Sequence, residues 1–284
     1  MKRLTLIAIL TVLLVGCGGG GGDPTPPLTN QALGGIWIGT DSDGLGITAL
    51  STDNGRLHWQ MGIFQEIPDP ILLPPVDPQP QAFGTASVTG SAVTIDYTLV
   101  VPLGSTLSDG STSATCSGTG TIQQRQRLTV SVDCVTSLGA AYSDSASLSY
   151  VSPLSDRDSA LIVVAGNYND RNSILNISGN GVIFEQNPVT GCVINGQVSI
   201  IDARFNVYDV SITYSSCLGN RDVLNGTTHT GLAHLSSGVL PELPELPELP
   251  ELPELPELPE VLLTLLTGEV NGVTVSSVFL FVRI

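Results

Sequence analysis

The chain has 284 residues, with 10 basic residues against 26 acidic ones and a formal net charge of −16. Lys2 is the only lysine in the sequence. This charge argues against a nucleic-acid partner, because phosphate binding needs clustered cations, and against docking on anionic lipid headgroups. The length suffices for two modest domains, each with its own apolar core.

The N-terminal segment is typical of a secretory signal. Lys2 and Arg3 precede an apolar run, residues 4–15, which is too short to span a bilayer. The run ends in Leu14-Val15-Gly16-Cys17, and this ending resembles the lipobox of bacterial lipoproteins. The resemblance implies that residues 1–16 form a signal peptide, that the chain is cut before Cys17, and that Cys17 is diacylated through its sulfur.

Residues 17–33 form a predicted tether between the lipidated cysteine and the folded part. A glycine run at 18–22 is flexible, and the prolines after it make the distal part stiffer. Gly18 stands where an aspartate would resemble an inner-membrane retention signal, so the sequence favours the outer membrane. The glycine run is similar to that of surface-displayed lipoproteins, although a plain spacer on the periplasmic face has the same composition. The membrane is therefore an expected partner through the acyl chains at Cys17, since stable anchoring needs more than one chain.

From Gly34 onward the pattern is typical of β-strands. Short alternating runs rich in Val, Ile, Thr, Ser and Tyr recur between turn residues, for example at 47–50, 92–97, 128–132 and 205–210. Asn54-Gly55, Asn180-Gly181 and Asn271-Gly272 each lie between such runs. Because Asn-Gly accepts positive φ at both central positions, each pair predicts a two-residue hairpin.

A weak internal repeat divides this β-rich part in two. Gly35-Ile36-Trp37 precedes a predicted strand and the Asn54-Gly55 hairpin, and Gly166-Asn167-Tyr168 precedes a similar strand and the Asn180-Gly181 hairpin. We therefore predict an all-β fold of two tandem small antiparallel β-barrels or β-sandwiches. Closure of each module would protect the edges of its sheet.

The predicted modules cover residues 34–151 and 160–284. Residues 152–159 would link them, with a helical turn near 155–160 that Ser155 caps. Residues 278–282 would form the last strand and close against the first strand of the second module.

Four cysteines remain after Cys17, and an even number in an oxidising compartment indicates disulfides. Three pairings are open. We favour Cys116–Cys134 and Cys192–Cys217, because each closes a short loop within one module and such a loop stabilises by roughly 3 kcal/mol. A metal or redox site is the alternative, but neither a Cys-x-x-Cys spacing nor a nearby histidine cluster supports it.

Two proline-rich segments are predicted loops. Residues 68–80 contain six prolines, which exclude a central strand; a connecting loop and a binding lip at a barrel mouth both fit. Residues 241–260 repeat Pro-Glu-Leu, which excludes an α-helix and favours polyproline II. This array lies between two strand-like runs, so we expect an insertion in a hairpin loop. A polyproline ligand for a grooved partner is the alternative.

No catalytic or metal-binding constellation emerges from the sequence. His58 lies in a predicted aromatic strand, and His229 and His234 are five apart, so they would point to opposite faces of one strand. Zinc needs three or four converging ligands, and no Gly-x-Ser-x-Gly elbow marks a serine nucleophile. Asp41-Ser42-Asp43-Gly44 lacks the later acids of a calcium loop and predicts a turn, and Gly118-Thr119-Gly120 lacks the rest of a dinucleotide fingerprint. We therefore expect no enzyme activity, no cofactor and no metal.

Trp37 and Trp59 are the most informative aromatic residues. Gly35-Ile36-Trp37 resembles the Gly-x-Trp of lipocalin-like barrels, which implies that Trp37 plugs a closed barrel end; plain core packing is the alternative. The two-module layout behind a glycine tether also resembles surface lipoproteins of the transferrin-binding-protein B type, which implies barrels without an enzymatic site. We expect an outer-membrane lipoprotein whose modules bind a protein partner or a small apolar ligand. The second functional hypothesis is a structural envelope lipoprotein without a ligand, and the third is a hydrolase.

Overall fold

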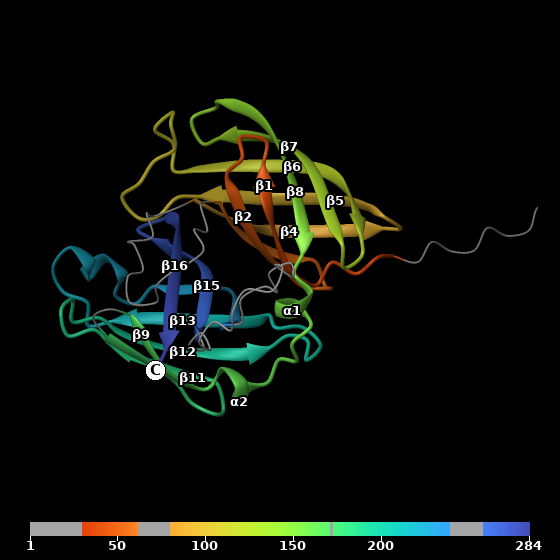
Figure 1. Cartoon of the computed structure of the whole chain (residues 1–284). Coiled ribbons are helices and arrows are strands. Elements are labelled where there is room, and N and C mark those ends of the chain that lie inside the picture. The colour runs from red at the N-terminus through yellow and green to blue at the C-terminus, as the bar shows by residue number, and fades with distance from the viewer. Residues whose placement is uncertain (1–29, 62–79, 171–172, 239–257) are drawn as a thin grey trace, which may run out of the picture.

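The computed structural model describes residues 30–61, 80–170, 173–238 and 258–284. These residues form two closed antiparallel β-barrels that lie against each other, with a short connecting segment between them (Figure 1). The prediction of two tandem all-β modules is confirmed. Of the two predicted architectures, β-barrel and β-sandwich, the structure has the β-barrel.

The first barrel contains β1 (Gly35–Asp41), β2 (Gly46–Ser51), β3 (Arg56–Met61), β4 (Gln81–Thr89), β5 (Ala92–Val100), β6 (Ser113–Gln123), β7 (Arg127–Thr136) and β8 (Ala141–Tyr150). Each strand pairs with the next, and β8 closes the barrel on β1 through pairs that include Trp37 with Tyr150. Two short helices follow, α1 (Ser152–Ser155) and α2 (Leu161–Val164).

The second barrel contains β9 (Gly166–Asp170), β10 (Ser173–Ile177), β11 (Val182–Gln186), β12 (Val193–Ile200), β13 (Tyr208–Ser215), β14 (Thr228–Gly238), β15 (Leu258–Val270) and β16 (Val273–Arg283), with the 3-10 helix η1 (Gly219–Leu224) after β13. The last strand β16 pairs with β9, as the sequence predicts. Apolar side chains fill both barrels, because every second residue of a strand points inward. In β7, for example, Leu128, Val130 and Val132 are buried in the core of the first barrel.

The internal repeat has a structural counterpart at the start of each barrel. Trp37 Nε1 donates to the Leu33 carbonyl at 2.9 Å, and Tyr168 Oη donates to the Val164 carbonyl at 2.7 Å. Both aromatic side chains are fully buried, and each acceptor lies four residues earlier in the chain. Tyr150 packs edge-on against Trp37, whereas Arg283 lies over the Tyr168 ring. The two modules therefore begin with the same local design.

The Asn-Gly pairs do not all form the predicted turn. At Asn271-Gly272 both residues have positive φ, 53° and 78°, as a two-residue hairpin requires. At Asn54-Gly55 and Asn180-Gly181 only the glycine has positive φ, and its N–H closes a four-residue turn onto Thr52 or Ser178. The expectation was wrong at these two sites, because the Thr52 and Ser178 hydroxyls accept from the chain after the glycine and fix the longer loop.

Three further boundaries differ from the predictions. Ser155 ends α1 and caps no helix; its hydroxyl accepts from the Ile36 N–H at 2.8 Å. The run at 205–210 becomes strand only from Tyr208, because the Asn206 side chain turns away to donate to the Leu154 and Leu235 carbonyls. Residues 258–260, counted as the end of the Pro-Glu-Leu array, belong to β15. The rest of the array, residues 241–257, lies outside the described residues, between β14 and β15, which pair as a hairpin.

The two barrels share an apolar interface. Its members lie on outward faces, opposite to the side chains that fill each barrel: Ile36, Leu50, Val207, Leu232, Leu263 and Leu265. Strands β14, β15 and β16 of the second barrel approach β2, β3 and β5 of the first. Ion pairs flank this inter-barrel cluster, with Arg56 at 2.6 Å from Asp209 and Arg204 at 3.1 Å from Asp53. Burial of these side chains holds the two barrels together as one body.

Candidate functional site

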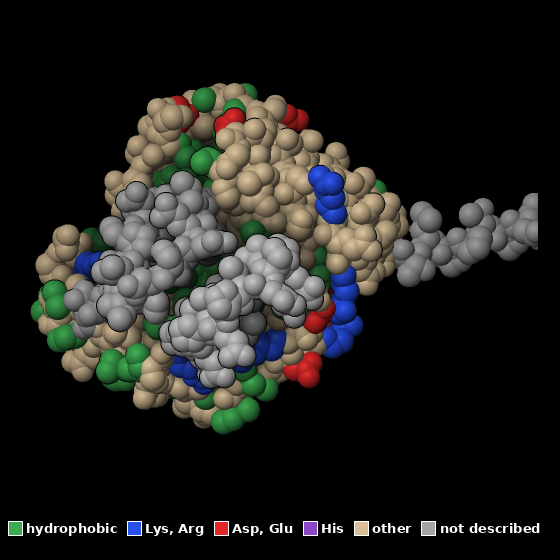
Figure 2. Space-filling model, viewed as in Figure 1, with side chains coloured by type: hydrophobic (Ala, Val, Ile, Leu, Met, Phe, Trp, Pro, Cys, Tyr) green, Lys and Arg blue, Asp and Glu red, His purple; other side chains and the backbone are tan. Residues whose placement is uncertain are grey.

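An open groove of about 700 Å³ lies on the outer face of the first barrel. It runs across β5–β8, and its described lining is Ser42, Thr94, Ser117, Gly118, Thr119, Ser131, Val132, Asp133, Ser143, Asp144 and Ser145. A smaller groove of about 350 Å³ adjoins it and shares Ser42, Thr119, Ser131 and Ser145. In Figure 2 the visible surface of the first barrel is mostly tan, the colour of uncharged polar side chains and backbone.

Hydroxyl side chains form cross-strand rows along this groove. One row joins Thr94, Thr119, Ser131 and Ser145 through the register of four neighbouring strands. A second row joins Thr121, Thr129, Ser147 and Thr40, and the hydroxyls of Thr121 and Thr129 are 2.9 Å apart. Since adjacent strands lie about 4.8 Å apart, the rows present hydroxyls at a regular spacing.

Glycines bring the strands of this face close together. A Cβ on Gly118 would lie 2.3 Å from the Ser131 carbonyl oxygen, and a Cβ on Gly120 would lie 2.0 Å from the Thr129 carbonyl oxygen. These distances are too short for any side chain, so Gly118-Thr119-Gly120 is a packing motif of β6.

Two carboxylates belong to the groove lining, and each is held on one oxygen. Asp133 lies on the outward face of β7, whereas Asp144 pairs with Val132 and lies on the inward face of β8. The Ser143 hydroxyl donates to Asp133 Oδ1 at 2.6 Å, and the Ser42 hydroxyl donates to Asp144 Oδ1 at 2.7 Å. Asp144 Oδ1 also accepts from the Ser145 N–H at 2.6 Å. Within the described part of the chain, the Oδ2 atoms of Asp133 and Asp144 accept no hydrogen bond. Asp133 therefore has one oriented oxygen on the outer face that is left for a ligand.

The described interior of the second barrel has little free space. Its apolar cavity, lined by residues such as Leu175, Ile212 and Phe281, has a volume of about 20 Å³. That is close to the space of one water molecule. This cavity cannot hold a small apolar ligand of the kind considered from the sequence.

The three histidines are buried and lie in two places. His58 on β3 and His234 on β14 lie on the outward faces that carry the inter-barrel cluster, beside Leu50 and Leu263. His229 points into the second barrel, where its Nδ1 is 3.1 Å from the Ser277 hydroxyl and its ring meets Tyr214 edge-on. His229 and His234 thus point to opposite sides of β14, as the sequence predicts.

Burial controls the protonation of all three histidines. It lowers the pKa of each to about 4, helped at His58 by the Arg56 charge and opposed at His234 by a backbone hydrogen bond with Leu235. They are therefore neutral at pH 7. None of them lines the described grooves, and the described residues contain no cluster of three His, Cys, Asp or Glu side chains suited to a metal.

The other sequence candidates have structural roles. Asp41 Oδ1 accepts from the N–H groups of Asp43 and Leu45, so the Asp41–Gly44 segment is a turn. Trp37 and Trp59 belong to the core of the first barrel, and Trp59 packs edge-on against Tyr97. Ser42, Gly118 and Thr119 were named from the sequence in other contexts, but a groove that they line with the serines of β7 and β8 was not predicted. Their signal was a hydroxyl or carboxylate at every second position of three successive strands.

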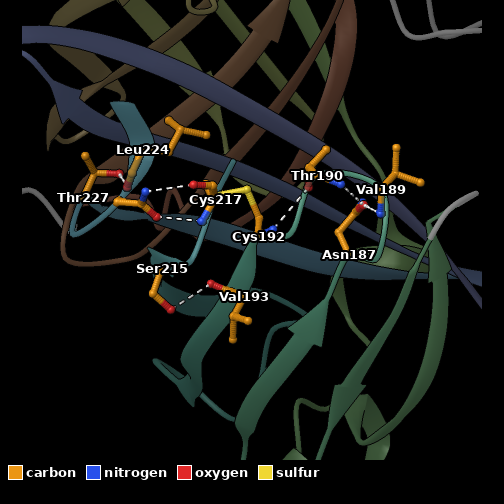
Figure 3. The surroundings of a disulfide bond; sticks show 10 residues. Asn187, Val189, Thr190, Cys192, Val193, Ser215, Cys217, Leu224 and Thr227 are labelled. Atoms are coloured by element: carbon orange, nitrogen blue, oxygen red, sulfur yellow. Dashed lines mark hydrogen bonds between the residues drawn. A yellow bond between two sulfur atoms is a disulfide. The ribbon is translucent and has the colours of Figure 1, made fainter. Parts of the chain in front are cut away.

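Both favoured disulfides are present in the structure. Cys116–Cys134 joins directly opposed residues of β6 and β7. Cys192–Cys217 joins the segment before β12 to the segment after β13 (Figure 3). There the Asn225 side chain accepts from the Cys217 N–H at 2.7 Å and donates to the Cys217 carbonyl. The two bonds occupy different strand pairs of their barrels, so the internal repeat does not extend to the disulfides.

Several sequence predictions lie outside the described residues. These are the signal peptide at 1–16, Cys17 and the tether up to residue 29, and the proline-rich segment at 68–79. Among the helices of the described ranges, none has the length and apolar character needed to cross a membrane.

The fold and the groove define an all-β protein with two packed barrels and a hydroxyl-lined outer face. No family model matches the sequence, and no curated protein is significantly similar to it.

Proposed function

We propose that this chain is an outer-membrane lipoprotein, anchored through Cys17, whose paired barrels serve as a binding module. The groove of about 700 Å³ on the first barrel is the observation that carries the binding role. Its volume falls in the range of ligand sites, and a groove on a closed, disulfide-bonded barrel needs little ordering when a ligand binds.

The proposed location rests on the N-terminal sequence and on the cysteines. The lipobox-like ending at Cys17 supplies the anchor, and two disulfides suit an oxidising, exported compartment. The small cavity of the second barrel has no room for a small apolar ligand. Neither His58 nor His229 lines the groove, so a hydrolase has the least support.

Mass spectrometry of the N-terminal peptide, combined with protease treatment of intact cells, tests the anchor. We expect a mature N-terminus at acylated Cys17, and loss of membrane attachment in Cys17→Ala. Clipping of the 241–257 segment on intact cells would place the protein on the cell surface, and protection until the outer membrane is breached would place it in the periplasm. An uncleaved N-terminus with unmodified Cys17 would refute the lipoprotein assignment.

A further inference from the structure

We propose that the groove on β5–β8 binds a neutral, polyhydroxylated ligand, that is, an uncharged glycan. This inference rests on the proposed binding function and names the ligand class for the same groove. Its evidence is the chemistry of the lining and the geometry of the Asp133 carboxylate.

The charge of the groove disfavours anionic ligands. Asp133 is the charged side chain on the outward face of its described lining, and no arginine belongs to that lining. Arg127 lies at the adjoining groove, where its guanidinium donates to the Ser147 hydroxyl at 2.9 Å. A phosphate, a sulfated sugar or a nucleic acid would meet the Asp133 carboxylate without compensating cations.

The groove also lacks the features of an apolar binding surface. Val132 is the one large apolar residue of its described lining, and it is only 6% exposed because it points into the barrel. Protein interfaces usually centre on aromatic or aliphatic anchors, and none is present among these lining residues. The groove therefore offers hydrogen bonds with very little apolar contact.

The available hydrogen bonds suit vicinal hydroxyl groups. Ser143 holds one oxygen of the outward Asp133 carboxylate, so the second oxygen of Asp133 is an oriented acceptor. Hydrogen bonds from a hydroxyl to a carboxylate are stronger than bonds between neutral groups. The rows of serine and threonine around it can both donate and accept, which matches a ligand whose hydroxyls do the same.

Direct binding to oligosaccharides tests the inference. The full acylated chain, held in a zwitterionic detergent without a sugar headgroup, is titrated with maltohexaose, cellohexaose, chitohexaose and mannohexaose. Sulfated forms of the same sugars and polyethylene glycol are the contrasts. We expect at least one neutral sugar to bind, and neither the sulfated forms nor polyethylene glycol to do so.

Groove variants locate the site. Asp133→Asn removes the charged acceptor of the outer face and should weaken binding on the order of tenfold or more. Thr119→Val removes a hydroxyl while keeping a strand-forming residue of similar shape. The matched control is Thr213→Val on the second barrel, where Thr213 pairs with Thr228 at 2.9 Å in the same way as Thr121 with Thr129.

Three outcomes would overturn the glycan inference: no neutral sugar binds, sulfated sugars bind equally well, or the groove variants bind like the control. A photocrosslinking residue in place of Ser143 is used in intact cells to find out whether the groove binds anything. It therefore distinguishes failure of the glycan inference from failure of the proposed binding function. Capture of a protein at that position, together with negative sugar titrations, would leave a binding module with a different ligand. Unmodified Cys17 would instead refute the anchor and leave the sugar result unaffected.

Discussion

Mild acid should destabilise this protein through its three buried histidines. His58, His229 and His234 are 7%, 1% and 6% exposed, and burial lowers the pKa of each from 6.5 to about 4. The unfolded chain therefore takes up protons below pH 6.5 that the folded chain does not. The stability due to the neutral histidines is complete above pH 6.5 and is lost as the pH falls towards 4.

The expected magnitude is large. Between pH 7 and pH 5 a pKa difference of this size costs about 2 kcal/mol per histidine, so three independent histidines cost about 6 kcal/mol. A typical domain has a total stability of about 5–15 kcal/mol, so the free energy of unfolding should fall by a large fraction. Carboxylates contribute mainly at lower pH, because their ordinary pKa values are near 4.

Urea unfolding at pH 7, 6 and 5, followed by tryptophan fluorescence, measures this loss. The protein must be free of a histidine tag, since tag protonation would affect both states. Single variants, His58→Gln, His229→Gln and His234→Gln, should each reduce the pH-dependent loss by about a third. An unfolding free energy that is the same at pH 7 and pH 5 would refute the reasoning, since it would mean that the histidines protonate within the folded protein.

Three further predictions concern stability at neutral pH. Leu265→Ala, in the inter-barrel cluster, should cost about 2–5 kcal/mol in urea unfolding, because the side chain is fully buried; a cost below 0.5 kcal/mol would refute tight packing there. Glu260→Gln should cost about 1 kcal/mol in the same assay, since Glu260 pairs with Arg157 and Arg283, whereas the exposed Glu269→Gln on the same strand should have no effect; equal costs would contradict this. Replacing Cys116 and Cys134 together by serine should lower the melting temperature by an amount equivalent to roughly 3 kcal/mol, and an unchanged melting temperature would show that the bond adds nothing.

The local features of the fold were predictable because they depend on nearby residues. Alternation in β5 and β7 marked strands, since side chains on a strand point to alternate faces. The turn at Asn271-Gly272 followed from its tolerance of positive φ. The turns at Asn54-Gly55 and Asn180-Gly181 differ from the predicted two-residue hairpin, because the hydroxyl of Thr52 or Ser178 stabilises a longer loop.

The candidate site was harder to foresee. Its residues are serines, threonines and two aspartates, which are also common on any solvated strand face. Alternation indicated that they point outward, but not that they line a groove. The close approach of Gly118 and Gly120 to the backbone of β7 is likewise visible only in the folded barrel.

The sequence by itself determined a β-rich chain in two repeated parts, with local disulfides and a buried aromatic residue at the start of each part. Sterics, side-chain alternation and short loop closure act over a few residues, so they can be recognised in the sequence. Only the tertiary structure decided that Leu50 and His58, on the outward face of the first barrel, are buried against Leu232 and Leu263 of the second. Burial of an outward side chain depends on what packs against it, and that partner lies more than 170 residues away along the chain.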